Sequence, residues 1–179
     1  MVREWLVAGG LVESPDGLLL VQNRRRDGSL DWSPPGGVID VSGGETVRCG
    51  LTREVGEETG LVVDGWAGPV YQVEAVAERL GWVLRVEVHL ATSYSGELAV
   101  NDPDGIVVDA RFVPWHAAEL HLDGSRRWVA EPLVGWLAER MPTREASEAG
   151  APTTRDTQSR SYRYRLEGDD AGRLEVVRL

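Results

Sequence analysis

The sequence predicts a fold of the mixed α/β or α+β class, because segments with strand periodicity alternate with segments of helical periodicity. The clearest strand covers residues 82–90, where every second residue is apolar: Trp82, Leu84, Val86, Val88 and Leu90. These side chains share one face of a strand, and the residues between them lie on the other face. The clearest helix covers residues 46–59 and ends at Gly60, since glycine is common just past the last helical residue.

The remaining elements follow from apolar runs and turn residues. Near the N-terminus we expect two antiparallel strands, over residues 4–13 and 18–21, joined by a turn at Ser14-Pro15-Asp16-Gly17. Residues 31–44 contain Pro34-Pro35 and four glycines and are expected to form a loop. The other expected elements are a strand over 70–77 paired with 82–90, a strand over 106–113, and a helix over 125–140 that Pro132 breaks or restarts.

The chain length of 179 residues suits one domain with an appendage. We expect the domain over residues 1–141, a polar linker over 142–161 and a β-hairpin extension over 162–179. An isolated hairpin is marginally stable in water, so this one must pack on its own domain, extend a sheet edge or pair with a second chain.

The composition limits the partners and the location. The net charge of −10 argues against a nucleic-acid partner, because a surface that grips nucleic acid is basic. The single cysteine, Cys49, excludes an intrachain disulfide and fits a reducing compartment, so a cytoplasmic location is expected. No stretch approaches the roughly 20 apolar residues of a membrane span, so no membrane partner is expected.

Three glutamates of the predicted helix carry the main chemical signal. Glu54, Glu57 and Glu58 are spaced i, i+3, i+4 and therefore share one helix face. Their carboxylates repel one another in the last turns, where the helix dipole favours basic residues. A solvated acidic face is the alternative. A hard divalent cation would remove the conflict, since Mg²⁺ takes oxygen ligands from carboxylates, water and substrate phosphates.

The segment around this helix resembles the Nudix box, written G-x5-E-x7-R-E-U-x-E-E-x-G-U, where U is aliphatic. The match begins at Glu45 and continues, at the spacing of the family, through Arg53-Glu54-Val55-Gly56-Glu57-Glu58-Thr59-Gly60-Leu61. Trp32 and Pro35-Gly36-Gly37 also resemble the loop that precedes the box in this family. The sequence departs in one place: seven residues, 38–44, separate Gly37 from Glu45, where the pattern has five.

The resemblance implies a Nudix-type α/β/α sandwich with a mixed central sheet, and it implies roles for residues of the box. Mg²⁺, or Mn²⁺ in its place, would be held by four residues: Gly37, through its carbonyl, and Glu54, Glu57 and Glu58. Arg53 would orient Glu54 through an ion pair. Glu45 would brace the loop against the helix, beside the substrate.

Residues outside the box supply further candidates. A carboxylate outside the box often assists in this family, and Asp102, Asp104 and Asp109 are the local candidates. We favour Asp104, because turn formation explains Asp102 at least as well. Arg24 and Arg26 follow a strand and are expected to point the same way, so both would reach substrate phosphate, with a solvated basic turn as the equal alternative.

These features predict a Mg²⁺-dependent hydrolase that cleaves the pyrophosphate bond of a nucleoside diphosphate derivative. The proline and the tyrosine that mark two subfamilies of the Nudix family are absent at Ala75-Val76-Ala77-Glu78, which leaves nucleoside triphosphates, normal or oxidised, as the default substrate. The alternative is a non-catalytic Nudix-like module that binds a nucleotide and regulates a partner. Because many Nudix enzymes are dimeric, we expect the hairpin to contribute to a homodimer rather than only to cover the edge of its own domain.

Overall fold

The computed structural model describes residues 2–140, 159–168 and 175–179. The strands are β1 (Arg3–Leu11), β2 (Glu13–Ser14), β3 (Gly17–Arg24), β4 (Leu30–Ser33), β5 (Gly36–Val38), β6 (Val62–Ala77), β7 (Trp82–Ser95), β8 (Val107–Val113), β9 (Arg160–Glu167) and β10 (Glu175–Arg178). The helices are α1 (Val47–Thr59), α2 (Ala118–His121) and α3 (Arg127–Arg140), with a 3₁₀ turn η1 (Trp115–Ala117).

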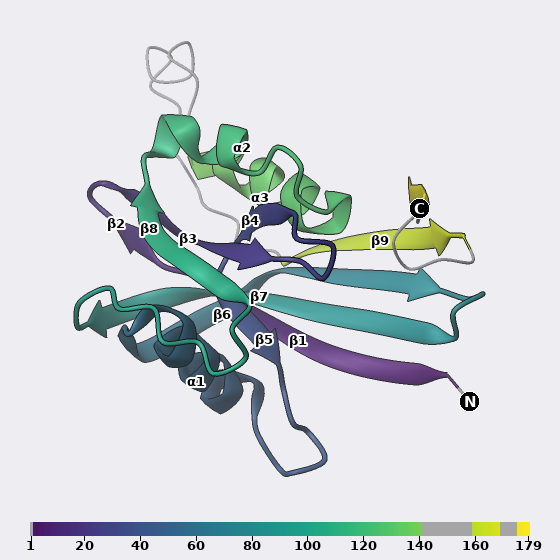
Figure 1. Cartoon of the computed structure of the whole chain (residues 1–179), viewed down its shortest axis with the longest axis horizontal. Helices are drawn as coiled ribbons and strands as arrows, with labels where there is room; N and C mark the ends of the chain where they lie inside the picture. Colours follow the sequence, from purple (N-terminus) through teal and green to yellow (C-terminus); the bar gives the residue numbers. More distant parts are fainter. Residues whose placement is uncertain (1, 141–158, 169–174) are drawn as a thin grey trace.

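The strands form two sheets, with α1 on one side of the molecule and α2 and α3 on the other (Figure 1). The first sheet has the order β10-β9-β6-β7-β1-β5; β1 is parallel to β7, β9 is parallel to β6, and the other neighbours are antiparallel. In the second sheet β3 pairs antiparallel with β2, β4 and β8. The predicted mixed α/β (α+β) class with a mixed sheet is confirmed, whereas the second sheet was not predicted.

The first predicted turn is correct, but the strand that it joins to β3 is not β1. Ser14 Oγ accepts hydrogen bonds from the N–H groups of Asp16 and Gly17, at 3.1 and 3.2 Å, which closes the turn. The two-residue β2 pairs with β3 across it, while β1 pairs with β5 and β7 in the other sheet. The chain changes sheets at Val12, whose side chain is fully buried.

Three other boundaries differ from the prediction. The region 31–44 is not a loop throughout, because β4 and β5 form on either side of Pro34-Pro35. The strands β6 and β7 extend beyond the predicted bounds, to Val62 and to Ser95, and the added parts contribute Val63, Trp66, Ala91 and Tyr94 to the core that Leu51 and Val55 of α1 share. The helix α3 runs through Pro132 without a break; the proline lies in its second turn and removes only one hydrogen bond.

The helix α1 ends where the sequence predicted, and for the predicted reason. Thr46 caps its N-terminus, where the side chain accepts a hydrogen bond from the N–H group of Cys49 at 3.3 Å. Gly60 follows its last residue with φ 76°, a left-handed conformation that favours glycine, and donates to the carbonyl of Gly56 at 2.9 Å. This sharp end makes Glu58 the penultimate residue of the helix and sends the chain into β6.

Two hydrophobic cores hold the layers together. Leu51 and Val55 of α1 pack with one set of buried residues: Ala8, Val12, Leu19, Ile39, Leu61, Val63 and Trp66. Leu133 and Leu137 of α3 pack on the other core, against the opposite face of the six-stranded sheet. The alternation predicted for β7 is confirmed there, because Val88 is buried in this second core and the other four apolar residues of that face pack against it.

The C-terminal hairpin extends the sheet of its own chain. β9 pairs with β6, and alternate residues of β9, Tyr162, Tyr164 and Leu166, are buried in the second core. The hairpin therefore covers an edge of its own domain, which was the second of the two roles considered for it. Its contribution to a homodimer stays a prediction. Of the expected linker, residues 142–158 lie outside the described residues, and β9 begins near its end, at Arg160.

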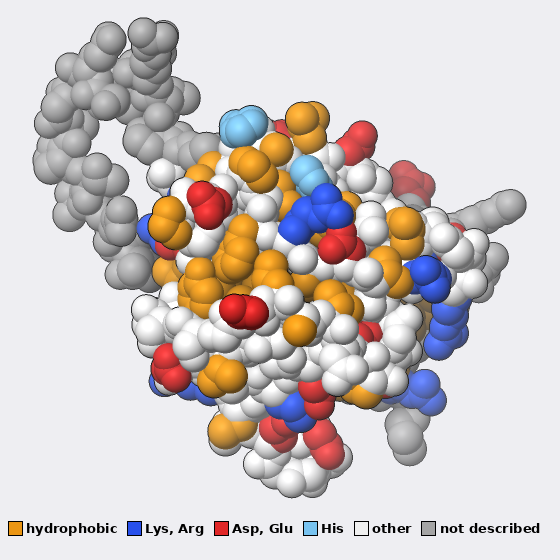
Figure 2. Space-filling view, turned by 60° about the vertical axis from the view of Figure 1, so that its left-hand side comes forward, with side chains coloured by type: hydrophobic (Ala, Val, Ile, Leu, Met, Phe, Trp, Pro, Cys, Tyr) orange, Lys and Arg blue, Asp and Glu red, His pale blue; other side chains and the backbone are white. Residues whose placement is uncertain are grey.

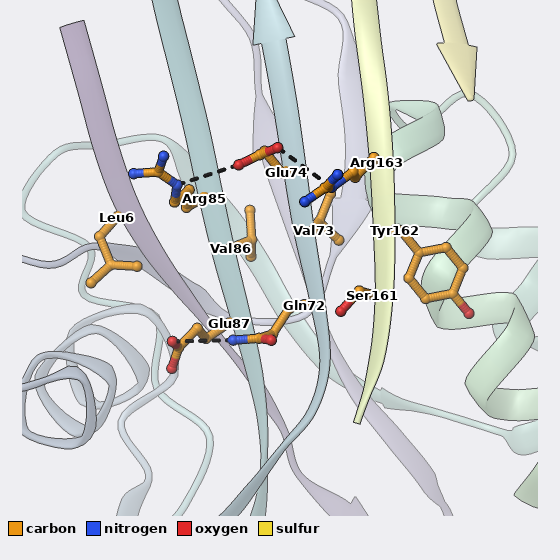
Figure 3. A pocket seen from close by; sticks show the side chains of 10 residues that line it. All are labelled: Leu6, Gln72, Val73, Glu74, Arg85, Val86, Glu87, Ser161, Tyr162 and Arg163. Carbon is orange, nitrogen blue, oxygen red and sulfur yellow. Dashed lines mark hydrogen bonds and ion pairs between the residues drawn. The ribbon is translucent and has the colours of Figure 1, made fainter. Parts of the chain in front are cut away.

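Ion pairs cross four strands on the open face of the six-stranded sheet, beyond the area that α1 covers. Arg85 of β7 lies between Glu4 of β1, at 2.6 Å, and Glu74 of β6, at 3.4 Å. Arg163 of β9 reaches the other oxygen of Glu74 at 3.7 Å (Figure 3). Exposed pairs of this kind contribute about 0–1 kcal/mol each, so the buried tyrosines dominate the docking of the hairpin.

We expect Tyr164→Ala to lower the free energy of unfolding by about 3–5 kcal/mol, since a fully buried aromatic side chain would leave a cavity. The neighbouring exposed residue of the same strand provides the control, and Arg165→Ala should change the free energy by less than about 0.5 kcal/mol. Urea unfolding of both variants measures the difference. Equal stability of the two variants would show that the hairpin is not docked in solution.

Candidate active site

Arg53 lies at the centre of the acidic face of α1. Its guanidinium binds Glu45 at 2.9 and 3.2 Å, Glu54 at 2.9 Å and Glu57 at 3.0 Å. The hydrogen bond from Arg53 is the main reason that the pKa of Glu45 lies below its usual value. Glu45 also accepts a hydrogen bond from the N–H group of Asp40 at 3.0 Å, so it joins the loop that precedes the helix to the helix itself.

Glu58 is the most deeply buried of the three glutamates, with 9% of its surface exposed. Its Oε2 accepts a hydrogen bond from the N–H group of Gly36 at 2.8 Å. Burial raises the pKa of Glu58 to about 8, and the charges of Glu54, Asp102 and Glu57 act in the same direction. A buried carboxylate surrounded by other carboxylates favours the binding of a cation.

Gly37 lies directly against Glu54. A β-carbon on Gly37 would lie 2.4 Å from Oε2 of Glu54, so only glycine lets this carboxylate approach the strand so closely. Gly37 is held in place because it pairs with Ala8 in the ladder between β1 and β5. Burial raises the pKa of Glu54, although the hydrogen bond from Arg53 opposes that shift.

The two additional residues of the loop before α1 do not move Gly37 away from the helix. The loop forms an exposed turn in which Oδ1 of Asp40 accepts hydrogen bonds from the hydroxyl of Ser42, at 2.7 Å, and from the N–H group of Gly43, at 2.8 Å. The chain then returns to Glu45, which contacts Arg53. The greater length is therefore accommodated at the tip of the loop.

The three aspartates outside the box have different surroundings. Asp102 accepts hydrogen bonds from the N–H groups of Asp104, Ile106 and Val107, at 3.1, 2.7 and 2.8 Å, so it shapes its own turn. Asp109 forms an ion pair with Arg111. Asp104 is exposed and lies close enough to Glu54 to raise the pKa of that carboxyl group. Of the three, Asp104 is the one whose carboxylate is exposed and acts on Glu54.

A cavity of about 140 Å³ opens on the other side of Gly36. Its floor consists of apolar side chains of the six-stranded sheet, including Tyr71, and its walls include Arg25, Pro34 and Trp128. Gly36 lines this cavity while its N–H group binds Glu58, so the carboxylates and the cavity meet at one residue. An apolar cavity with a few polar groups is the usual form of a small-molecule site.

Arg25, and neither Arg24 nor Arg26, is in the wall of this cavity. β3 ends at Arg24 and the chain then turns, with Gly28 donating to the carbonyl of Arg25 at 2.9 Å. Arg24 and Arg26 are exposed. Arg25 binds both carboxylate oxygens of Asp31 at 2.7 Å, which fixes its orientation.

Arg25, Asp31 and Trp128 are not among the site residues predicted from the sequence. The arginine belongs to the triplet Arg24-Arg25-Arg26, so the sequence did show a basic segment near the site. Trp128 comes from a helix that is distant in the sequence, and no local pattern brings it to Gly36. Only the packing of α3 on the sheet identifies Trp128 as part of the wall.

The residues around Glu58 have the chemistry of a site for a hard divalent cation. Within residues 2–140, 159–168 and 175–179, the side-chain positions in this structure form no group of three or more His, Cys, Asp or Glu residues that could hold a metal ion. Protein groups hold the carboxylates instead, with Arg53 on Glu54 and Glu57 and the N–H group of Gly36 on Glu58. Carboxylate oxygens beside a backbone carbonyl at Gly37 are donors that Mg²⁺ accepts.

The face shown in Figure 2 carries acidic, basic and hydrophobic side chains interspersed, and the described residues on it form no broad basic area. In the part of the chain that the structure describes, no helix is long and apolar enough to cross a membrane.

Comparison with known proteins places this geometry in a family. The model of the NUDIX domain matches residues 4–134. Comparison with the curated proteins found no match.

Solved structures with a similar fold include three bacterial proteins. The ORF135 protein of E. coli aligns with a TM-score of 0.60 at 17% identity, over 79% of this chain and 96% of that one. The MutT protein of Bacillus halodurans aligns with a TM-score of 0.59 at 18% identity, over 97% of both chains. The MutT NUDIX hydrolase of Burkholderia pseudomallei aligns with a TM-score of 0.55 at 23% identity, over 69% and 99%.

These structures support the fold, and the family model covers most of the chain, including the acidic face of α1 and both glycines of β5. Nudix hydrolases generally use divalent metals and act on small nucleotide substrates. The chain belongs to the NUDIX domain family.

Proposed function

We propose that the protein is a cytoplasmic, Mg²⁺-dependent hydrolase that cleaves the pyrophosphate bond of a nucleoside diphosphate derivative. The observation that carries this proposal is the position of Gly36, whose N–H group binds Glu58 while the residue lines the apolar cavity. A nucleoside in the cavity would present its phosphates to the glutamates of α1. Nucleoside triphosphates, normal or oxidised, are the default substrates.

The metal ligands in this proposal are four residues on α1 and β5: Gly37, through its carbonyl, and Glu54, Glu57 and Glu58. A bound Mg²⁺, or Mn²⁺, would neutralise pyrophosphate oxygens and lower the pKa of an attacking water. The close approach of Glu54 to Gly37 supports this set, because it brings a carboxylate and the strand backbone together.

The other residues of the site orient these ligands or assist them. Arg53 holds Glu54 and Glu57 in one orientation through its two ion pairs. Glu45 fixes Arg53 and the preceding loop beside the substrate. Asp104, exposed and near Glu54, is our candidate for the additional carboxylate that accepts the proton of the water.

Arg25, Tyr71 and Trp128 are our candidates for substrate contact in the cavity. The guanidinium of Arg25 has a fixed orientation, the ring of Trp128 gives a surface on which a base can stack, and the buried Tyr71 contributes to the floor beneath it. Arg24 and Arg26 lie on the adjoining turn, where their charge would attract phosphates from solution.

Two other functions make different demands on the site. A non-catalytic module that binds a nucleotide has no need of a buried carboxylate with a raised pKa, whereas the structure has one in Glu58. A general magnesium-dependent phosphatase would release single phosphates and would not split a pyrophosphate bond.

We expect hydrolysis of at least one substrate in a panel of nucleoside triphosphates, oxidised triphosphates, ADP-ribose and dinucleoside polyphosphates, with Mg²⁺ required. Chromatography of the products distinguishes a split pyrophosphate from released phosphate. In the same assay Glu57→Gln should lower kcat by about 10²–10³-fold, as expected for the loss of one group that stabilises charge in the transition state. Turnover of Glu57→Gln near that of the natural sequence would disprove the metal assignment.

We expect Glu58→Gln to stabilise the protein when EDTA removes divalent metals. The pKa of Glu58 is raised to about 8 in the fold, so the ionised form is disfavoured there and its cost grows as the pH rises from about 4.5 to 8. The variant should therefore melt at nearly the same temperature as the natural sequence at pH 4 and at a clearly higher temperature at pH 8. Each kcal/mol gained in the free energy of unfolding corresponds to about 2–4 °C.

Glu119→Gln, at an exposed residue of α2, provides the matched control and should leave the melting temperature unchanged at both pH values. Adding Mg²⁺ should reverse the order of Glu58→Gln and the natural sequence. A variant that is less stable than the natural sequence in EDTA at pH 8 would contradict the inference that ionised Glu58 destabilises the fold.

We expect Arg53→Lys to lower kcat by about 10–100-fold with little change in KM, the effect typical of residues that orient metal ligands. Lysine keeps the charge but cannot bind Glu45, Glu54 and Glu57 together through one planar group. Steady-state kinetics on the best substrate of the panel measures both constants. A change confined to KM would instead place Arg53 in contact with the substrate.

A further inference from the structure

A second cavity, of about 260 Å³, adjoins the first. The two have Arg25 and Trp128 in both of their linings, so they are neighbours that meet at these two side chains. Whereas the first cavity is apolar, the second is lined mainly by charged side chains: Arg25, Asp27, Asp31, Arg126 and Arg127. Neither Gly36 nor any glutamate of α1 is among the residues that line it.

The two aspartates of this cavity are already occupied by neighbouring groups. Both oxygens of Asp31 accept hydrogen bonds from Arg25, at 2.7 Å each. Asp27 accepts two hydrogen bonds from Ser29, at 3.0 Å from its N–H group and at 2.6 Å from its hydroxyl. These contacts leave the arginines as the groups with donors to offer.

Arg126 is the most available of these arginines. Its guanidinium carbon lies 5.3 Å from the centre of the Trp128 ring, so the ring supports the group from one side. Among the described residues, none of the ion pairs within 4 Å includes Arg126. An arginine that is stacked on an aromatic ring and keeps its donors free is well suited to a phosphate.

The C-terminal hairpin closes the rim of this cavity. Arg127 donates to the carbonyl of Val176 in β10 at 3.0 Å and to Glu131 at 2.9 Å. Arg178 of β10 binds the other oxygen of Glu131. Because β10 lies outside residues 4–134, this rim is an addition to the part of the chain that matches the family.

We propose that this second cavity is a distal subsite that binds a phosphate group on the nucleoside half of the substrate, with Arg126 as the principal ligand. The proposal rests on the proposed function for the direction of the substrate. The pyrophosphate lies at Gly36, the nucleoside spans the apolar cavity, and the additional phosphate lies at Arg126. A phosphate on the 2′ or 3′ hydroxyl of the ribose has this arrangement, since it is separated from the 5′ phosphates by the sugar.

Binding measurements on the full chain test the proposal without turnover. The probes are the 5′-monophosphates of adenosine and cytidine, and the 2′,5′- and 3′,5′-bisphosphates of the same nucleosides. None contains a pyrophosphate bond, so a failure to hydrolyse the substrate panel and a failure of this subsite are separate results. By calorimetry we expect at least one bisphosphate to bind about 10–100-fold more tightly than its monophosphate, as expected for hydrogen bonds to a charged group.

Arg126→Ala should remove this difference while leaving the affinity for the monophosphate unchanged. Arg126→Lys, which keeps the charge but loses the planar stack on Trp128, should remove part of it. Arg48→Ala is the matched control, because Arg48 is exposed on α1 and the change in net charge is the same. The control should keep the full difference.

Three results would overturn the proposal. One is equal binding of the monophosphates and bisphosphates, or no binding of any bisphosphate. Another is an equal loss of affinity in Arg126→Ala and Arg48→Ala, which would show that only net charge matters. The third is displacement of the bisphosphate by inorganic phosphate at equal concentration, since that would assign the cavity to free phosphate and not to the substrate.

Discussion

The contact between the carboxylate of Glu58 and the N–H group of Gly36 organises the site, because it fixes the end of α1 against β5. β5 is a short strand, and its pairing with β1 gives it a fixed position in the sheet. Ionised Glu58 is costly in this environment, and one backbone hydrogen bond offsets only part of that cost. The sequence nevertheless places two further glutamates beside it. The fold therefore holds at this position a concentration of negative charge that packing alone does not explain.

Arg53 makes this concentration of charge compatible with a stable helix. It contacts three carboxylates, of which Glu45 lies outside the helix. Its side chain is 40% exposed, so solvent screening keeps the stabilisation from each pair small. Its larger effect is geometric, since one planar group fixes the directions of several carboxylates. Glu58 has no such partner among the described residues, and it is the buried one.

The sequence predicted those parts of the site that depend on local spacing. Glu54, Glu57, Glu58 and Arg53 lie within two helical turns, so helix periodicity alone places them on one face. Gly60 was predicted to end α1 for a local reason, and its positive φ shows that reason in the structure. Arg25 and Trp128 could not be predicted in this way, because they meet only after α3 packs on the sheet. The place of β1 in the six-stranded sheet could not be predicted either, because its pairing with β5 and β7 depends on contacts between segments that are distant in the sequence. The hairpin was recognised from alternation, but its partner strand β6 could not be read from that pattern.

The two neighbouring cavities adjoin groups of opposite charge, and this contrast would determine how an elongated phosphorylated molecule lies across them. At the end near Gly36, the glutamates repel phosphate unless a divalent cation neutralises them. At the end near Arg126, phosphate is attracted without a cation. The net charge of the chain is −10, so this cavity, with three arginines and two aspartates in its lining, differs in sign from the chain as a whole. A ligand with phosphates at both ends would bind both sites in one orientation only. The separation of charge would therefore favour ligands that carry two separated phosphates, and it would determine which phosphate lies at which site.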